Sequence, residues 1–156
     1  MKGRHSCWLA PAAFLLDRFT KLLACRLLTP GRHIEAIPGL FRFTLARNTG
    51  AAFSMLSGRT ALLSVVSALL LAAVSVIIWR SMCLTRAGYL AFACLLGGGI
   101  GNLIDRMLLG GVTDYIRLLL FRFPVFNLAD IAITMSIAVL MLLLLRGRLE
   151  ENEHHG

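Results

Sequence analysis

The sequence predicts an all-α integral membrane protein with four membrane-spanning helices and a small β element at one membrane surface. Of its 156 residues, 58% are hydrophobic and only 15% are charged, whereas a soluble domain carries about 25% charged residues. Four long apolar stretches recur along the chain, and a polar segment containing proline and glycine separates the first two. Because the length is that of a single domain, we expect residues 1–156 to form one membrane-embedded unit.

The first apolar stretch predicts a helix over about residues 7–28. A short basic segment precedes it, so its start resembles a secretory signal peptide. The charged residues Asp17, Arg18 and Lys21 interrupt the apolar run, which then resumes. We therefore expect one uncleaved spanning helix, in which Asp17 and Lys21 are four residues apart and form an internal ion pair.

The polar segment that follows predicts a β element over about residues 33–57. The apolar side chains Phe41 and Phe43 alternate with the polar side chains Arg42 and Thr44. Such period-two alternation is typical of a half-buried strand. An Asn-Thr-Gly sequence, which favours a turn, comes next. We expect this element to lie on the membrane surface.

Three further apolar stretches predict spans at about residues 60–79, 87–106 and 126–145. At 1.5 Å per residue, each approaches the roughly 30 Å thickness of the hydrocarbon core. The glycine-rich residues 97–101 lack the GK[ST] ending of a phosphate-binding loop. We interpret them as a surface for close helix packing. A polar tail, residues 146–156, ends the chain.

The net charge of +8 does not indicate nucleic-acid binding. The basic residues are scattered between apolar runs and are not gathered in a stripe. Lys and Arg flank membrane spans and meet anionic headgroups, so we expect membrane lipid to be the partner of these charges. The four cysteines form no CxxC pair, and we therefore expect neither a disulfide framework nor a metal site.

The chain places its aspartates where lipid makes them costly. All four lie in or at the edge of an apolar stretch, as Asp17, Asp105, Asp114 and Asp130. A charge at the bilayer centre costs at least about 2.5–3.5 kcal/mol, so four of them require an explanation. Because the chain direction alternates between spans, we expect all four to return to one depth. For Asp105, which Asn102 and Arg106 flank on one helical face, we favour a structural or site-organising role.

Asp114 and Asp130 are the candidate catalytic residues. Two carboxylates in a site of low dielectric constant cannot both ionise easily, so the pair shares a proton. Aspartic peptide hydrolysis requires such a pair, because one carboxylate takes a proton from water while the other protonates the carbonyl oxygen. The same aspartates could equally serve as a proton relay in a transporter or channel. A Ser-Lys dyad of Ser54 or Ser57 with Lys21 is a weaker alternative.

Four motifs resemble those of the lipoprotein signal peptidase (signal peptidase II) family, and they occur in the family's order. They are LDRFTK at residues 16–21, NTGAAFS at 48–54, GNLIDR at 101–106 with GGVTDYI at 110–116, and FPVFNLAD at 123–130. Together the motifs are highly specific, and the resemblance extends over residues 16–145.

The resemblance implies a four-helix enzyme of the bacterial cytoplasmic (inner) membrane. Both termini would lie in the cytoplasm, and an extracytoplasmic β-cradle would lie near the active site. The enzyme would be an aspartic endopeptidase that removes the signal peptide from diacylglyceryl-modified prolipoproteins, cutting on the amino side of the lipidated lipobox cysteine. The resemblance further implies no metal, no other cofactor, and inhibition by globomycin-type cyclic peptides.

The resemblance also implies roles for individual residues. It makes Asp114 and Asp130 the catalytic dyad, with Asp17 and Lys21 as structural support. The residues that line the substrate and inhibitor site would be Asn48, Gly50, Asn102, Asp105, Arg106 and Asn127. Arg18 departs from the family, since Gln is common there, and the loop 115–129 over the site is short and unusually apolar. A non-catalytic scaffold with the same fold would bind lipoproteins without cleaving them.

Overall fold

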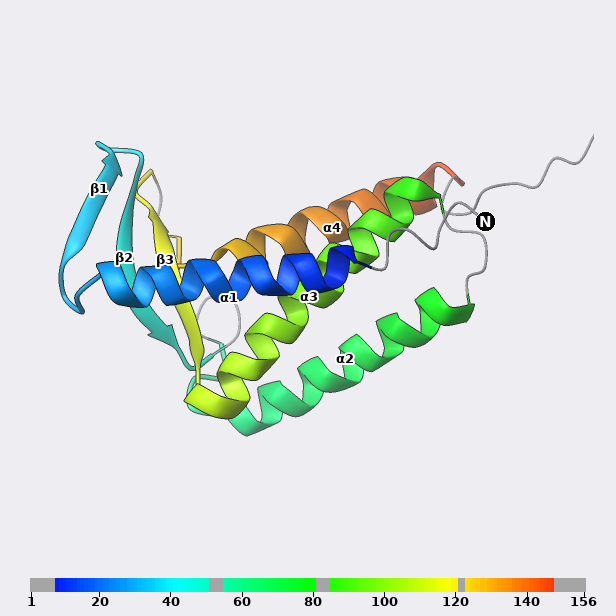
Figure 1. Ribbon diagram of the computed structural model, residues 1–156, viewed down its shortest axis with the longest axis horizontal. Coiled ribbons are helices and arrows are strands. Elements are labelled where there is room, and N and C mark those ends of the chain that lie inside the picture. The colour runs from blue at the N-terminus through cyan, green and yellow to red at the C-terminus, as the bar shows by residue number, and fades with distance from the viewer. Residues whose placement is uncertain (1–7, 51–54, 81–84, 121–122, 148–156) are drawn as a thin grey trace, which may run out of the picture.

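In the computed structural model, the described residues form four helices with a three-stranded antiparallel sheet at one end of the helices (Figure 1). The structure describes residues 8–50, 55–80, 85–120 and 123–147. In chain order the elements are α1 (Leu9–Leu27), β1 (His33–Ile37), β2 (Phe41–Asn48), α2 (Thr60–Arg80), α3 (Arg86–Leu109), β3 (Val112–Leu118) and α4 (Leu128–Leu145). The start of the predicted first span at residue 7 and residues 148–156 of the predicted tail lie outside this described part.

The helices agree closely with the predicted spans. Helix α2 begins at the predicted residue, α3 extends three residues past the predicted end, and α4 begins two residues late. In the part of the chain that the structure describes, α2, α3 and α4 are long and apolar enough to cross a membrane. Helix α1 does not meet that criterion of length and composition, because Asp17, Arg18, Lys21 and Arg26 lie among its 19 residues.

The predicted β element over residues 33–57 needs two corrections, because its strands end earlier than predicted and the sheet has a further strand. Strand β2 ends at Asn48, and residues 55–58 form a turn. The sheet also contains β3, which we did not predict. Strand β3 follows the helix-ending Gly110 and pairs with β2 from a distant part of the chain. Its sequence, VTDYIRL, has only a weak period-two pattern. It forms a strand because it pairs with β2, and a local pattern does not report such long-range pairing.

Strand β2 is the central strand, and its register with β3 positions one candidate catalytic residue. The strand order is β1-β2-β3, and both pairs are antiparallel. Asn48 pairs with Val112, and Ala46 pairs with Asp114. The end of β2 therefore holds Asp114 beside the Asn48 turn, where the backbone nitrogen of Gly50 donates to Asn48 Oδ1 at 3.0 Å.

Helix α3 lies at the centre of the bundle and packs against the other three helices. Its glycines allow this approach. A Cβ atom at Gly97 would lie 2.5 Å from the carbonyl oxygen of Ala10, and one at Gly101 would collide with the carboxylate of Asp17. The interpretation of residues 97–101 as a packing surface is confirmed. The close approach brings the charged face of α1 directly against α3.

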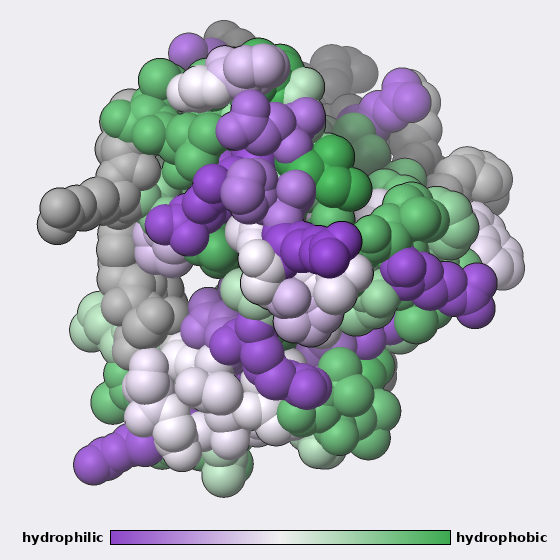
Figure 2. All heavy atoms as spheres, turned by 90° about the vertical axis from the view of Figure 1, so that its left-hand side faces the viewer, coloured by the Kyte–Doolittle hydropathy of each residue, from purple (hydrophilic) through white to green (hydrophobic). Residues whose placement is uncertain are grey.

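The outer surface of the bundle is apolar, as expected for a protein whose solvent is lipid. Large hydrophobic side chains are exposed on α1, including Leu15 and Phe19, and on α2, including Leu69 and Leu70. Figure 2 views the sheet end of the molecule, where hydrophilic side chains form a band with hydrophobic side chains on both sides. Such an exterior is that of a membrane protein with a polar surface at this end.

Candidate active site

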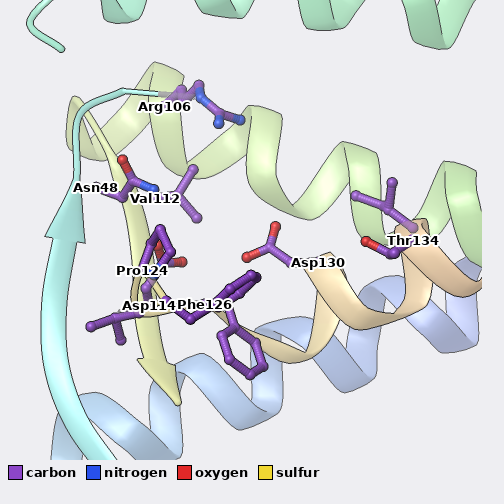
Figure 3. A pocket seen from close by; sticks show the side chains of 11 residues that line it. Asn48, Arg106, Val112, Asp114, Pro124, Phe126, Asp130 and Thr134 are labelled. Atoms are coloured by element: carbon purple, nitrogen blue, oxygen red, sulfur yellow. The ribbon is translucent and has the colours of Figure 1, made fainter. Parts of the chain in front are cut away.

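Asp114 of β3 and Asp130 of α4 line the same cavity, whose volume is about 230 Å³. Figure 3 shows the Asp130 side chain extending from the first turn of α4 toward β3, where Asp114 lies. The other lining residues are Asn48, Arg106, Val112, Phe123, Pro124, Val125, Phe126, Ile133 and Thr134. The structure therefore brings together two aspartates that lie on different elements.

The start of α4 fixes the position of Asp130. Asn127 is the N-cap residue, and its Oδ1 accepts a hydrogen bond from the backbone nitrogen of Asp130 at 3.0 Å. In return, Asp130 Oδ2 accepts a hydrogen bond from the backbone nitrogen of Asn127 at 3.1 Å. This reciprocal capping box satisfies two otherwise unpaired donors of the helix terminus. The carboxylate of Asp130 is thereby held at the N-terminus of α4 and cannot rotate freely.

Two buried amide side chains connect the aspartates. Asn127, which is fully buried, donates from Nδ2 to Asp114 Oδ1 at 2.7 Å. The same nitrogen donates to Asn102 Oδ1 at 3.3 Å. Asn102 Nδ2 donates to Asp130 Oδ1 at 2.8 Å. The predicted site residues Asn102 and Asn127 therefore act together, and each holds one carboxylate of the pair.

The electrostatic environment of Asp114 favours its protonated form near neutral pH. The residue is only 1% exposed. Burial, followed by the charge of Asp130, raises the pKa of Asp114 from 3.8 to about 7. Hydrogen bonds from Asn127 and Asn48 oppose this rise but do not cancel it. A carboxyl group with such a pKa can hold or release a proton at physiological pH.

A second group of buried charges lies beside the cavity. We call Asp17, Arg18, Lys21 and Asp105 the ion cluster. Arg18 donates to Asp105 at 2.7 Å and to Asp17 at 3.0 Å, and Lys21 Nζ lies 3.0 Å from Asp17 and 3.1 Å from Asp105. The predicted ion pair between Asp17 and Lys21 is confirmed.

Two of the residues predicted to line the site, Asn48 and Arg106, are on the wall of this cavity, and the other four, Gly50, Asn102, Asp105 and Asn127, are not. Asn102 and Asn127 lie behind the wall and donate to the two carboxylates. Asp105 is not on the cavity wall, because both of its oxygens face the ion cluster and Oδ2 also accepts from the backbone nitrogen of Thr113 at 3.0 Å. Gly50 lies in the turn that orients Asn48 and is likewise absent from the cavity wall. Their places in the structure are those of residues that support the site from behind.

Several contributors were not predicted from the sequence. Phe123 and Phe126 form the apolar side of the cavity, and their rings pack edge to face. The predicted loop 115–129 is in fact partly strand, and Phe126 pairs back with Ile116. Thr134 lies one helical turn after Asp130, and this spacing could have identified it. Nothing in the local sequence pairs Arg18 with Asp105, which is 87 positions away.

Among the described residues, no group of three or more His, Cys, Asp or Glu side chains could hold a metal ion. The surroundings of Lys21 weigh against a Ser-Lys dyad. The ammonium group of Lys21 donates toward Asp17, Asp105 and Asn102, so its three N–H groups are engaged and it is poorly placed to activate a serine. Ser54 lies outside the described residues.

Comparison with known proteins gives a consistent family. The family model described as "Signal peptidase (SPase) II" matches residues 9–146. A lipoprotein signal peptidase of Gloeobacter violaceus is 41% identical over 141 residues, which cover 90% of this chain and 82% of the relative. A lipoprotein signal peptidase of Pseudomonas aeruginosa strain PAO1 is 39% identical over 157 residues, covering 96% of this chain and 92% of the relative.

Solved structures show the same fold. A structure described as a bacterial membrane enzyme, solved at 2.3 Å resolution by the in meso method, superposes with a TM-score of 0.85. Its sequence is 28% identical, and the match covers 97% of this chain and 93% of the solved chain. A second bacterial membrane enzyme, solved at 1.9 Å, gives a TM-score of 0.82 at 29% identity, covering 91% and 93% of the two chains.

Proposed function

Because the chain belongs to the signal peptidase II family, we propose that it is an aspartic endopeptidase that removes the signal peptide from diacylglyceryl-modified prolipoproteins. It cuts on the amino side of the lipidated cysteine. One observation carries the aspartic mechanism: Asp114 and Asp130 line one cavity and are linked through Asn127. Two carboxylates that are held by amides and lie in a buried site are suited to share one proton.

The catalytic step follows from this pair. One carboxylate accepts a proton from water, which attacks the scissile carbonyl carbon, while the protonated carboxyl group donates to the carbonyl oxygen. The apolar wall formed by Phe123, Val125 and Phe126 keeps the dielectric constant of the cavity low. Low dielectric keeps one proton on the pair, so both an acid and a base are present at the same pH.

We further propose that all four helices cross the bacterial cytoplasmic membrane, with both termini in the cytoplasm and the sheet on the extracytoplasmic side. Helix α1 can span despite its charges, because Asp17 and Lys21 are buried against α3 while Leu15 and Phe19 face outward. Charges that face the bundle interior and pair with one another are tolerated at membrane depth. The dyad, near the sheet end of the bundle, would then lie near the extracytoplasmic face.

The substrate would enter sideways from the bilayer. An apolar cavity of about 450 Å³ lies between α2, α3 and α4. It shares Arg106, Asp130 and Ile133 with the cavity of the dyad. This continuity supports a path in which apolar parts of the lipidated substrate occupy the larger cavity and the scissile bond reaches the aspartates. Globomycin-type cyclic peptides would inhibit by occupying the same space.

The proposal is tested with purified protein in lipid and a diacylglyceryl-modified prolipoprotein, with cleavage followed by gel shift. The variants Asp114→Asn and Asp130→Asn are compared with wild type and with Glu35→Gln, which removes an exposed carboxylate of β1. We expect each dyad variant to lose at least about a thousandfold in rate, the order of general acid–base contributions. Glu35→Gln should cleave like wild type.

Four outcomes would count against the proposal. Equal cleavage by the dyad variants would move the chemistry to other residues. Equally fast cleavage of the unlipidated precursor would remove lipid recognition. Binding of the lipidated precursor by wild type without cleavage would indicate a non-catalytic scaffold, and ion flux dependent on both aspartates would indicate a transporter.

A further inference from the structure

A continuous chain of hydrogen bonds connects the ion cluster to the dyad. Lys21 Nζ, buried between α1 and α3, donates to Asn102 Oδ1 at 2.6 Å. Asn102 Nδ2 then donates to Asp130 Oδ1 at 2.8 Å. The ammonium group can only donate, so it fixes the oxygen of Asn102 toward itself. The amide nitrogen must therefore point at Asp130.

This chain makes the two aspartates unequal. Asp130 accepts N–H groups at both oxygens, from Asn102 at Oδ1 and from the backbone of Asn127 at Oδ2. It also lies in the first turn of α4, where the helix dipole favours a negative charge. Hydrogen bonds to the charged form stabilise that form. Asp114 lies on a strand, without a helix dipole, and accepts its hydrogen bonds from the side chains of Asn127 and Asn48.

The two cations that face Asp130 act in the same direction, and the Asp114 carboxylate acts against them. From α3, the guanidinium of Arg106 interacts with Asp130 more strongly than with Asp114. From α1, the ammonium of Lys21 attracts the Asp130 charge. From β3, the Asp114 carboxylate opposes a second negative charge nearby. Two cations therefore favour a negative charge at Asp130. The repulsion from Asp114 disappears when Asp114 carries the proton.

We propose that the ion cluster, acting through Asn102, holds Asp130 as the ionised member of the dyad, so that Asp130 takes the proton from water and Asp114 begins the cycle protonated. Lys21 and Arg18 are positioning residues in this scheme, because neither touches the reacting atoms. The assignment of roles rests on the proposed peptidase function, but the charge assignment can be measured without catalysis.

The reaction balances with these roles. As the water oxygen bonds to the scissile carbonyl carbon, a water proton moves to Asp130, and the proton of Asp114 moves to the carbonyl oxygen. When the tetrahedral diol collapses, the carbon–nitrogen bond breaks and the proton on Asp130 moves to the leaving nitrogen. A hydroxyl proton of the diol returns to Asp114. One water is consumed, and both aspartates recover their starting states.

Arg18 is the residue of the ion cluster whose replacement tests the proposal with the least disturbance of the fold. With Arg18, two cations balance the carboxylates of Asp17 and Asp105. Without it, Lys21 alone would face both carboxylates, and the cluster would carry a net negative charge beside Asn102. That charge would make ionisation of Asp130 less favourable. The Arg18 side chain is 24% exposed, so its replacement disturbs the packing less than Lys21→Met would.

The test is a pH titration of the buried carboxyl groups by difference infrared spectroscopy of the full-length protein in lipid. At neutral pH we expect the band of a protonated carboxyl group to disappear in Asp114→Asn. In Asp130→Asn the band should remain but titrate at lower pH than in wild type, because the charge of Asp130 no longer raises the pKa of Asp114. In an Asp114→Asn background, Arg18→Gln should shift the titration of Asp130 upward by about one pH unit, the order expected for loss of a nearby buried charge. The matched control is Arg26→Gln, an exposed arginine on the same helix, which should leave it unchanged.

A pH profile of kcat/KM gives the second readout. With Asp114 intact, Arg18→Gln should move the acid limb to higher pH and leave the basic limb in place, whereas a purely structural role would lower the rate equally at every pH. Persistence of the neutral-pH band in Asp114→Asn would reverse the roles and overturn the proposal. Equal titrations for Arg18→Gln and Arg26→Gln would overturn it as well. If the infrared results hold but wild type cleaves no prolipoprotein, the proposed function fails and the charge assignment stands.

Discussion

The ion cluster and the dyad are two buried polar groups that differ in how their charge is balanced. In the ion cluster, the carboxylates of Asp17 and Asp105 meet two cations at 2.7–3.1 Å. In the dyad, the nearest hydrogen-bond donors of Asp114 and Asp130 are amides, from Asn102 and Asn127. Because its charges are balanced, the ion cluster joins helices. Because no cation bonds directly to its carboxylates, the dyad can exchange protons. Aspartates in equally apolar stretches thus serve opposite purposes.

The largest expected effect breaks the ion cluster. Asp105→Ala leaves Arg18 and Lys21 with only Asp17 as a carboxylate partner. Removing one partner of a buried ion pair costs about 3–5 kcal/mol, because a buried charge is left uncompensated. We expect a large fall in the thermal unfolding midpoint in detergent. The control Glu35→Ala, at an exposed position, should leave the midpoint near the wild-type value, and equal midpoints for both variants would contradict a stabilising cluster.

A steric change tests whether the ion cluster depends on close helix packing. In Gly101→Ala, the added methyl group collides with the carboxylate of Asp17, and overpacking of this kind costs about 1–3 kcal/mol. The matched control is Gly99→Ala, where the new Cβ atom meets the flexible end of Leu71. Differential scanning fluorimetry should show the larger loss of stability for Gly101→Ala. The reverse order would place the close contact elsewhere.

The dyad should respond to pH. Above about pH 7, where Asp114 loses its proton, we expect the cleavage rate to fall about tenfold per pH unit, because the acid of the pair is lost. A rate that stays constant across this range would contradict the need for a protonated aspartate.

Stability should follow the same group, with a definite sign. The pKa of Asp114 is raised from 3.8 to about 7 on folding, so the folded protein binds more protons between these values. The contribution of protonated Asp114 to the free energy of unfolding is fully present below about pH 3.8 and is lost as pH rises through about 7. Unfolding midpoints should therefore fall across this range in wild type and fall less in Asp114→Asn.

The smallest expected effect concerns the neutral hydrogen bonds of Tyr115, the residue that follows Asp114. The Tyr115 hydroxyl accepts from the backbone nitrogen of Leu128 at 3.3 Å. The hydroxyl also forms a hydrogen bond with the Thr20 side chain. Tyr115→Phe removes both neutral hydrogen bonds and should cost about 1 kcal/mol. A small decrease in the unfolding midpoint with a nearly unchanged cleavage rate would match this role. A loss of activity comparable to that of Asp130→Asn would place Tyr115 within the chemistry.

Much of the architecture could be predicted because lipid imposes it on the local sequence. Apolar runs of about 20 residues become helices, since backbone polar groups must be satisfied within the segment. The bounds of α2, α3 and α4 agree with those runs to within three residues at each end. The ion pair of Asp17 and Lys21 was predictable for a related reason, because it depends only on helical spacing.

The sequence by itself determined that this chain spans a membrane and which aspartates need an explanation, because both follow from the cost of polar groups in lipid. Only the tertiary structure decided which aspartates belong to the ion cluster and which to the dyad. Strand β3 reaches Asp114 through pairing with a distant strand, and Arg18 finds Asp105 across a helix interface made close by Gly101. Such contacts join residues far apart in the chain, so no local pattern encodes them. Packing therefore assigned Asp105 to the ion cluster and left Asp114 and Asp130 facing each other across a cavity.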